Sequence, residues 1–395
     1  MCVKSWGTPG PSAWTALRAG LHELRPCANP LDWKGSGKYR TPGARELLKK
    51  TWSAADSTST RESLHRRMAR TVSTPRLLLN LILSTLCAPA LAFSWGCEGH
   101  QIIALIALKQ LNPNALNRAH QLLRGRRVDS HLERLCGANT LDVFADVSTW
   151  ADDIRNERRE TASWHFIEIP LDAPRNDLNR FCPSKAGCVT KAIHEQMERL
   201  RSGNGTDRER AEALMFLIHF VGDLHQPLHT AGNGDRGGNC LPVTFFGTRP
   251  ELQGNTPEEL AKESFRPNLH GVWDNDLVAK VSGKWTVTEF SNRLSREFVM
   301  QIASWKEQSI NVDNWAWENH RQAVRTAYGQ LSKPVPREMA QTVGDCSDNN
   351  HVSQRMKRLN ERLGNPYLRA ARPVLKEQLV KAGTRLAMLL NQLWP

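Results

Sequence analysis

Several features that define other classes of protein are missing from this sequence. No internal repeat is visible, and no linker rich in proline and glycine divides residues 95–395, which argues against a repeat array and a second domain there. The apolar run at residues 77–91 is too short, and too interrupted by Asn80 and Pro89, for a stable membrane span. Only residues 243–246 form a convincing strand-like run, so the sequence predicts no extensive sheet.

The positive charge of the chain is concentrated near its start. The 395 residues include 53 Lys and Arg and 40 Asp and Glu, a net charge of +13. Residues 1–94 contain 14 of the basic and 5 of the acidic residues, so they account for +9 and leave +4 for residues 95–395. The main body is therefore only mildly basic, and its charge alone does not indicate nucleic-acid binding.

Residues 68–94 have the pattern of a secretory signal peptide. Arg70 and Arg76 give a basic start, an apolar run follows, and residues 92–94 place small side chains at the positions that a signal peptidase inspects. A buried core helix is the alternative interpretation. We expect a secreted or periplasmic monomer that begins at Trp95 and has no stable membrane association.

Residues 1–67 lie upstream of a signal that should be N-terminal. They are rich in Gly, Pro, Ser, Thr and basic residues and have no sustained apolar period, which is the composition of a chain that buries no core. We interpret them as an extension of the gene model upstream of a true start at Met68, with a disordered leader as the alternative. N-terminal sequencing of the secreted product distinguishes the two.

The cysteines predict disulfides in the main body. Three of the nine precede Trp95, and six follow it, an even number in a chain bound for an oxidising compartment. We expect three disulfides among Cys97, Cys136, Cys182, Cys188, Cys240 and Cys346. Cys182 and Cys188 flank a short turn and are expected to pair with each other, whereas the other pairings cannot be read from the sequence.

The apolar periodicity after Trp95 is helical almost throughout, so we predict a single all-α domain over residues 95–395 with a short β-hairpin or loop insertion. Residues 164–169 are predicted to be an extended connector and residues 231–238 a glycine-rich loop. The predicted helices cover residues 99–111, 115–123, 141–159, 189–200, 208–224, 287–305, 314–328 and 370–393.

One stretch, residues 218–229, concentrates groups that can bind a metal ion. His219 and Asp223 are four residues apart, so on a helix they project from the same face. His270 and Asp274 repeat that spacing. A single such pair is more often a surface hydrogen bond or a capped core histidine than a ligand pair, but imidazole and carboxylate together are the ligand set of hydrolytic zinc.

The order of these motifs resembles a known family, the trinuclear-zinc single-strand-specific nucleases and 3'-nucleotidases of fungi, plants and bacteria. Their superfamily includes zinc-dependent phospholipase C, and the resemblance implies its mainly helical fold. It extends from Trp95 through the last predicted helix. It rests on Trp95-x3-Gly-His100, Trp150-Ala-Asp152, His165-Phe166-Ile167, His219-Phe-Val-Gly-Asp223-x2-Gln-Pro-Leu-His229, Gly237-Gly-Asn239 and Asn268-Leu-His270-x2-Trp-Asp274.

The resemblance implies three zinc ions. Asp152, His165 and His219 would hold the first, and Asp223 would bridge it to the second, which His100 and the α-amino group and carbonyl oxygen of Trp95 would also hold. The third would be held by His229, His270 and Asp274. Ligation by the amine of Trp95 requires removal of the preceding 94 residues.

Four further residues are candidates for acting on the substrate. Arg155 follows Asp152 by one helical turn and could neutralise charge on phosphoryl oxygens, although a surface arginine is the alternative. Glu168 stands where the family usually has aspartate, so its geometry or the base preference could differ. Phe166 resembles an aromatic residue on which a base stacks, with burial in the core as the alternative. Asn239 is expected to touch the substrate.

These observations predict a secreted zinc-dependent endonuclease that cleaves single-stranded DNA and RNA to products with 5'-phosphates and has 3'-nucleotidase activity. Zinc-dependent phospholipase C is the first alternative and a non-catalytic zinc-binding protein is the second. The spacing of Gly232, Gly234 and Gly237 matches a dinucleotide fingerprint, but no strand precedes it, so that reading is rejected.

Overall fold

The computed structural model describes residues 95–124, 136, 140, 142–336, 344–348 and 350–395. The predicted signal peptide at residues 68–94 and the segment at residues 1–67 lie outside the described residues. Within the described ranges, no helix combines the length and the apolar character needed to cross a membrane. The architecture is mainly helical, which confirms the predicted fold class.

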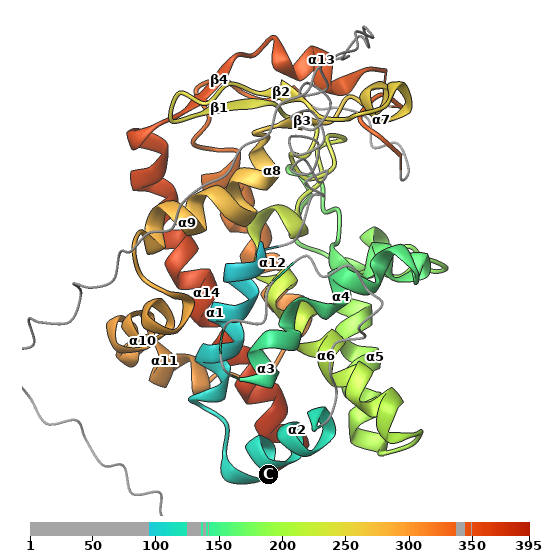
Figure 1. Ribbon diagram of the computed structural model, residues 1–395, viewed down its shortest axis with the longest axis vertical. Coiled ribbons are helices and arrows are strands. Elements are labelled where there is room, and N and C mark those ends of the chain that lie inside the picture. The colour runs from blue at the N-terminus through green and yellow to red at the C-terminus, as the bar shows by residue number, and fades with distance from the viewer. Residues whose placement is uncertain (1–94, 125–135, 137–139, 141, 337–343, 349) are drawn as a thin grey trace, which may run out of the picture. The chain divides into compact units, whose positions relative to one another are not determined.

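Three helices pack against one another and carry or support the candidate site: α1 (Cys97–Leu108), α6 (Asp207–Leu224) and α14 (Asn365–Leu393) (Figure 1). Helix α1 is buried without interruption from its third to its eleventh residue, because neighbouring elements cover it on all sides. A Cβ at Gly383 of α14 would lie 2.8 Å from the carbonyl oxygen of Ile103. The absence of a side chain there lets α1 and α14 approach closely.

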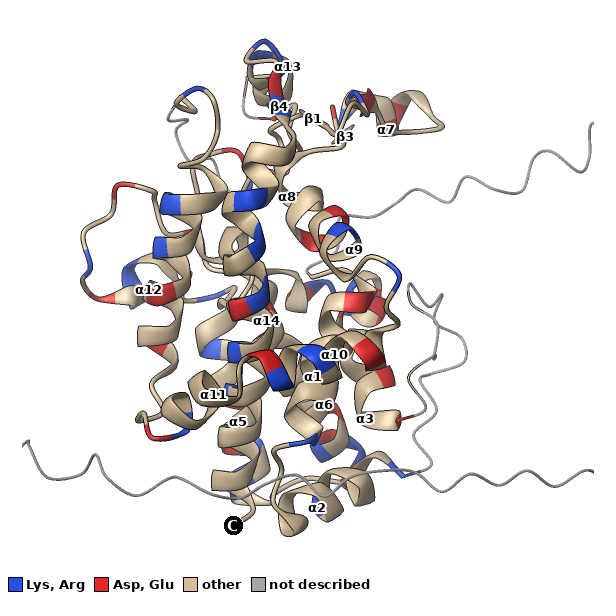
Figure 2. Ribbon diagram, turned by 90° about the vertical axis from the view of Figure 1, so that its left-hand side faces the viewer, with Lys and Arg blue, Asp and Glu red and all other residues tan. Residues whose placement is uncertain are grey.

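Helix α14 carries Lys and Arg side chains along much of its length (Figure 2). Two of them anchor it to neighbouring helices. Lys376 Nζ lies 2.9 Å from a carboxylate oxygen of Glu297, and the buried Arg385 donates to Glu318 over 2.6 Å. The helix is therefore fixed by charge pairs as well as by its apolar face.

Most predicted helices are present with small differences at their ends. Residues 115–123 and 189–200 fall in α2 (Pro113–Leu123) and α5 (Val189–Ser202). Residues 314–328 fall in α12 (Val312–Gln322) and a π-helical turn, η7 (Ala323–Ala327), that continues it. Asn112 caps α2 by accepting from the amide of Ala115, and Pro113 follows it at the first helical position.

The single helix predicted over residues 141–159 is wrong, because the described part of this segment is broken into short turns. One cause is tertiary: the carbonyl oxygen of Ser148 accepts a hydrogen bond from His219 Nδ1 over 2.7 Å. That carbonyl group therefore bonds to a histidine of the candidate site. The turns are α3 (Val143–Asp146), η1 (Val147–Thr149), α4 (Trp150–Asp153) and η2 (Ile154–Asn156).

The helix predicted over residues 287–305 is also divided. Phe298, with φ −105° and ψ 19°, ends α10 (Val287–Glu297) and begins α11 (Val299–Lys306). The predicted extended connector begins later than expected, because residues 164 and 165 complete the 3₁₀ helix η3 (Arg159–His165). Beyond it the chain is extended, and the amide of Ile167 donates to the carbonyl of His229 over 2.8 Å.

Strands are few in the described residues. The predicted strand is present as β1 (Val243–Phe245), but its partner is the distant β4 (Glu361–Leu363), which runs parallel to it. A second pair joins β2 (Glu251–Leu252) to β3 (Phe265–Arg266) in antiparallel order. Short helices complete this region: α7 (Pro257–Ala261), α8 (Leu269–Gly271), the π-helical turn η6 (Val272–Asp276), α9 (Leu277–Ser282) and α13 (Val352–Lys357).

All six cysteines that follow Trp95 form disulfides. Cys182 pairs with Cys188, as predicted from the turn between them. The pairs that the sequence left open are Cys97–Cys136 and Cys240–Cys346. Three disulfides are typical of a protein that folds in an oxidising compartment.

Candidate metal centre

Helix α6 and the turn after it form one wall of the candidate site. His219 and Asp223 project from the same face of α6 near its end at Leu224, and both are fully buried. The chain then enters the 3₁₀ turn η5 (Pro227–Thr230), which carries His229. Proline at the start of this turn supplies no amide hydrogen and cannot extend α6.

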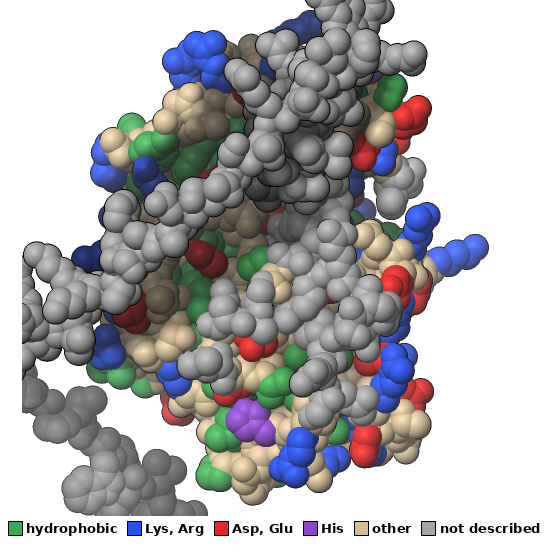
Figure 3. All heavy atoms as spheres, in the orientation of Figure 1, with side chains coloured by type: hydrophobic (Ala, Val, Ile, Leu, Met, Phe, Trp, Pro, Cys, Tyr) green, Lys and Arg blue, Asp and Glu red, His purple; other side chains and the backbone are tan. Residues whose placement is uncertain are grey.

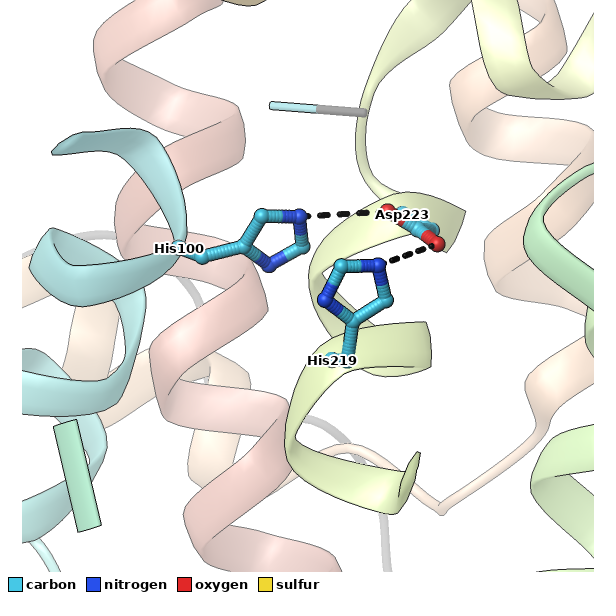
Figure 4. A group of neighbouring side chains, drawn as sticks. All are labelled: His100, His219 and Asp223. Atoms are coloured by element: carbon cyan, nitrogen blue, oxygen red, sulfur yellow. Dashed lines mark ion pairs between the residues drawn. The ribbon is translucent and has the colours of Figure 1, made fainter. Parts of the chain in front are cut away.

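The first group of candidate ligands joins α1 to α6 (Figure 4). His100 Nε2 lies 3.3 Å from Asp223 Oδ1, and His219 Nε2 lies 3.2 Å from Asp223 Oδ2. The two imidazole rings are stacked, with their centroids 4.0 Å apart. One carboxylate thus faces a histidine with each of its oxygens.

The second group shares members with the first. Asp152 lies on α4 and His165 ends η3, and both are buried. His165 Nδ1 lies 3.6 Å from Asp152 Oδ1, and His219 Nε2 lies 3.7 Å from Asp152 Oδ2. His219 belongs to both groups, and His165 Nδ1 also lies 3.0 Å from Asp223 Oδ2 of the first group.

The third group joins the turn η5 to the segment formed by α8 and η6. His229 Nε2 and His270 Nε2 lie 3.2 Å apart, and His270 Nε2 lies 3.3 Å from Asp274 Oδ2. His229 Nδ1 also lies 3.9 Å from Asp223 Oδ1. The described residues therefore contain three buried sets of His and Asp side chains with ligand atoms close enough to hold a metal ion: His100, His219 and Asp223; Asp152, His165 and His219; and His229, His270 and Asp274.

Hydrogen bonds to carbonyl groups fix the tautomers of the third group. His229 Nδ1 donates to the carbonyl of His165 over 2.7 Å, and His270 Nδ1 donates to the carbonyl of Gly237 over 2.8 Å. Burial lowers the pKa of both imidazoles, that of His270 to about 4, so both rings are neutral. Their Nε2 lone pairs then face each other, an arrangement that a cation bound by both nitrogens would stabilise.

The carboxylates also fit metal ions. Asp152 Oδ1, Asp223 Oδ1 and Asp274 Oδ2 are buried and accept no hydrogen bond from the described residues. A buried carboxylate oxygen without a donor is unfavourable. Neutral imidazole nitrogen and carboxylate oxygen, without cysteine, form a donor set suited to catalytic zinc.

The charges of His219 and Asp223 act on each other, because both side chains are buried and lie 3.2 Å apart. Burial raises the pKa of Asp223 to about 7. Burial alone would lower the pKa of His219, but the carboxylates of Asp223 and Asp152 outweigh it and raise that pKa to about 9. A metal ion would stabilise the same carboxylates in place of the proton.

The absence of a side chain at Gly222 leaves room for the His100 ring beside α6. A Cβ at Gly222 would lie 2.7 Å from His100 Nδ1 and 2.9 Å from His100 Cε1. Trp95 is fully buried just before α1, and the amide of Gly96 donates to the carbonyl of Asp274 over 2.7 Å. Trp95 therefore stands next to the candidate site, while its part as a ligand stays a prediction.

The candidate substrate residues lie on two segments beside these groups. Arg155 Nη1 is 3.7 Å from Asp152 Oδ1, and its side chain is 35% exposed, so the guanidinium can face both the site and solvent. Phe166 follows His165 directly and is half-buried. Both positions are compatible with the predicted contacts to phosphate and base.

Glu168 packs against the glycine-rich loop at residues 231–238, and Asn239 directly follows that loop. A Cβ at Gly232 would lie 2.9 Å from Glu168 Cβ, so the exposed Glu168 stands against the loop. The side-chain amide of Asn239 donates to the carbonyl of Arg236 over 2.9 Å. Asn239 thus has a partner within that loop, and its contact with substrate stays a prediction.

Sequence reasoning missed residues that hold the ligands in place. Gln226 is buried and donates from Nε2 to Asp274 Oδ1 over 2.6 Å. Asn319 on α12 donates to the carbonyl of Gln226 over 2.7 Å and to the hydroxyl of Thr230 over 3.0 Å. The position of Gln226 between Asp223 and His229 was a usable signal, whereas nothing near Asn319 in the sequence marks it.

Three adjacent groups of buried His and Asp side chains in a mainly helical fold are consistent with a metal centre. The profile of the S1/P1 nuclease family matches residues 95–395. The chain belongs to this family of nucleases, which confirms the resemblance found in the sequence.

Three relatives from fungi and plants illustrate the similarity. The chain is 27% identical to nuclease S1 of Aspergillus oryzae over 329 residues, covering 80% of this chain and 97% of the relative. It is 30% identical to nuclease P1 of Penicillium citrinum over 224 residues, covering 53% and 71%. It is 25% identical to endonuclease 2 of Arabidopsis thaliana over 319 residues, covering 76% and 90%.

Proposed function

We propose that this protein is a zinc-dependent phosphodiesterase that cleaves single-stranded DNA and RNA, leaves 5'-phosphates, and removes the 3'-phosphate from nucleotides. The observation that carries the proposal is the sharing of His219 between two adjacent candidate ligand groups, with Asp223 of one group 3.0 Å from His165 of the other and a third group beside them. Membership of the S1/P1 nuclease family supports a nucleic-acid substrate.

Three zinc ions are the proposed cofactors. Asp152, His165 and His219 would hold the first, and Asp223 would bridge it to the second. His100 and the α-amino group and carbonyl oxygen of Trp95 would complete the second, and His229, His270 and Asp274 would hold the third. Zinc ions held in this way would supply Lewis acidity toward a phosphate ester and lower the pKa of water.

The protein's own side chains would bind and orient the substrate. Arg155 would neutralise charge that builds on the phosphoryl oxygens, because its guanidinium lies beside Asp152 and reaches solvent. Phe166 would stack on a base, a contact that tolerates any base and needs an unpaired strand. Glu168 would orient the arginine or meet the base, and Asn239 would contact the nucleotide.

Charged side chains of both signs are visible on one face of the molecule. On the face shown in Figure 3, Lys and Arg side chains alternate with Asp and Glu among the described residues that are visible. We propose that binding of nucleic acid depends on the candidate centre and on Arg155 beside it.

Secretion is part of the proposal. The three disulfides support an oxidising compartment. Removal of the proposed signal at residues 68–94 would free the amine of Trp95 for ligation, so processing and metal binding would be coupled. The product is proposed to be a monomer without stable membrane association.

The test is a substrate panel for protein that begins at Trp95. Single-stranded DNA, RNA and a 3'-mononucleotide should be hydrolysed, and Asp223→Asn should abolish hydrolysis while the helical circular dichroism is retained. Release of diacylglycerol from phosphatidylcholine with single-stranded DNA left intact would instead identify a phospholipase C. Zinc binding without hydrolysis of any substrate would identify a non-catalytic zinc-binding protein.

A further inference from the structure

Three arginines place positive charge around the third ligand group. The charges of Arg155, Arg236 and Arg266 all act on His270. His270 is also the most exposed of the three side chains in its group, at 8%, against 3% for His229 and 0% for Asp274. Of the three, Arg266 has a guanidinium nitrogen close to the residue that follows His270, since its Nη1 lies 3.8 Å from where a Cβ of Gly271 would be.

These arginines differ in their partners. Arg155 Nη1 lies 3.7 Å from Asp152 Oδ1, and Arg236 Nη1 lies 3.9 Å from Asp345 Oδ1. The side chain of Arg266 has neither an ion pair nor a hydrogen bond with any residue that the structure describes. Its guanidinium thus has five donors and no protein acceptor among those residues.

Three carboxylates lie near Arg266, but none of them forms an ion pair with it. Asp274 and Asp276 act on its charge from beyond ion-pair distance. Asp274 is already engaged by Gln226 through Oδ1 and faces His270 with Oδ2. Glu251 stands opposite Arg266 in the β2–β3 strand pair but is exposed and makes no ion pair with it.

The backbone holds Arg266 firmly at this position. It is the last residue of β3, two residues before Asn268, which caps α8 by accepting from the amide of Gly271 over 2.8 Å. The side-chain amide of Asn268 also donates to the carbonyl of Phe265 over 2.9 Å. Arg266 Nη1 lies 3.8 Å from where a Cβ of Gly271 would be, next to His270 in the chain.

A guanidinium in this setting is suited to an anion. Arg266 is half-buried, and burial lowers its pKa because the charged form loses water. A partly desolvated charge without a partner is unfavourable. An anion that accepts two hydrogen bonds from the guanidinium would replace the hydrogen bonds to water that burial removes. The planar fork of arginine matches phosphate oxygens in bidentate geometry.

We propose that Arg266 binds a phosphate group of the substrate at the side of the site formed by His229, His270 and Asp274. This inference rests on the proposed function and adds a residue that specifies where the phosphate lies. The phosphate is either the one that is cleaved or a neighbouring one in the strand, and the chemistry of recognition is the same for both.

The first test measures binding without turnover. Arg266→Gln, Arg266→Lys and the wild-type chain, all loaded with zinc, are titrated with inorganic phosphate by calorimetry. Arg266→Gln should weaken phosphate binding about tenfold to a hundredfold, the usual value of a charge-assisted hydrogen bond. Arg266→Lys should recover part of the affinity, because it keeps the charge and loses the fork.

Arg362→Gln is the matched control. Arg362 also lies in a short strand, β4, but its side chain is exposed. Its substitution should leave phosphate affinity unchanged. Equal zinc content and equal melting temperature in all variants would show that Arg266→Gln has not disturbed the ligands or the fold. If Arg266→Gln loses zinc, Arg266→Lys alone decides, and a Kd for phosphate equal to that of the wild type overturns the proposal.

The second test identifies which phosphate is bound. KM and kcat of Arg266→Gln are compared with those of the wild type for two substrates. A 3'-mononucleotide has one phosphate, and a trinucleotide adds a neighbouring one. A higher KM for both substrates places Arg266 on the cleaved phosphate, and a higher KM for the trinucleotide alone places it on the neighbour. Unchanged KM for both, with unchanged affinity for inorganic phosphate, overturns the proposal. If the wild type cleaves neither substrate, the proposed function fails, and phosphate binding still decides the role of Arg266.

Discussion

Gln226 donates a hydrogen bond from Nε2 to Asp274 Oδ1 over 2.6 Å, and both residues are fully buried. The contact joins the N-cap of η5, just after the end of α6, to η6, and the two residues are 48 positions apart in the sequence. It orients one oxygen of Asp274 and leaves the other facing His270. Gln226 is therefore a positioning residue for the third ligand group.

Gln226→Met should weaken metal binding by the third group. The substitution keeps the length of the side chain and removes the Nε2 donor, together with the Oε1 that accepts from the amide of Leu228. Loss of such a partner typically costs about tenfold to a hundredfold in metal affinity. Competition with a chelator measures the affinity. The exposed Gln308 supplies the control, Gln308→Met, and equal affinities in both variants would contradict the assigned role.

Gly222→Ala should damage the group formed by His100, His219 and Asp223. Within a helix this change is ordinarily stabilising by about 1 kcal/mol. Here the new methyl group would lie 2.7 Å from His100 Nδ1, so His100 must move, with a net loss of about 1–3 kcal/mol in stability. Urea denaturation and metal analysis measure the two effects.

The control for this substitution is Gly364→Ala. Gly364 has negative φ, and the nearest atom to its added Cβ would be 3.9 Å away. Gly364→Ala should keep the full metal content. A Gly222→Ala protein with wild-type stability and metal content would show that His100 is free to shift.

The buried Asp235, which is not one of the candidate metal ligands, should make the stability of the protein depend on pH. Burial raises its pKa from 3.8 to about 6, although Tyr328 donates a hydrogen bond to it. Between pH 4 and pH 6 the unfolded chain therefore releases this proton before the folded protein does, and stability falls as pH rises. Below that window both states hold the proton and the effect vanishes.

Asp235→Asn should remove this dependence. The free energy of unfolding of the variant, relative to that of the wild type, should increase by about 3 kcal/mol between pH 4 and pH 7. Urea denaturation at several pH values measures the difference, and groups unaffected by the substitution cancel. A difference that is constant with pH would contradict the raised pKa.

The disulfides should contribute unequally to stability. Cys240–Cys346 closes a separation of 106 residues, and Cys182–Cys188 closes 6. Chain entropy assigns about 5 kcal/mol to the first and about 2 kcal/mol to the second. Replacing each pair by alanine and measuring urea denaturation tests this order. An equal loss of stability for both pairs would show that the entropy of the unfolded chain is not the main source of the stabilisation.

The sequence predicted the parts of the site that depend on local spacing. His219 and Asp223 are one helical turn apart in α6, and Pro227 begins a new turn, as their spacing indicated. The same spacing marked His270 and Asp274, and the resemblance assigned the remaining candidate side chains. The structure gathers those of His100, Asp152, His165, His229, His270 and Asp274 around His219 and Asp223.

Contacts between distant segments could not be predicted in this way. The carbonyl of Ser148 is used by His219, and this contact accompanies the break in a segment whose apolar pattern indicates one helix. Strand β1 was visible in the sequence, but its partner β4 is more than 100 residues away. Arg266 has an unremarkable position in the sequence, and only the fold shows that it lacks a partner beside His270.

The most direct test of the central claim is elemental analysis of protein that begins at Trp95, compared with protein that keeps residues 1–94. The account predicts about three zinc ions per chain in the first, because each of the three groups would hold one, and loss of the ion that depends on the amine of Trp95 in the second. Cleavage of single-stranded DNA should follow the zinc content. Full hydrolysis by protein without bound metal, or equal zinc content in both forms, would contradict it.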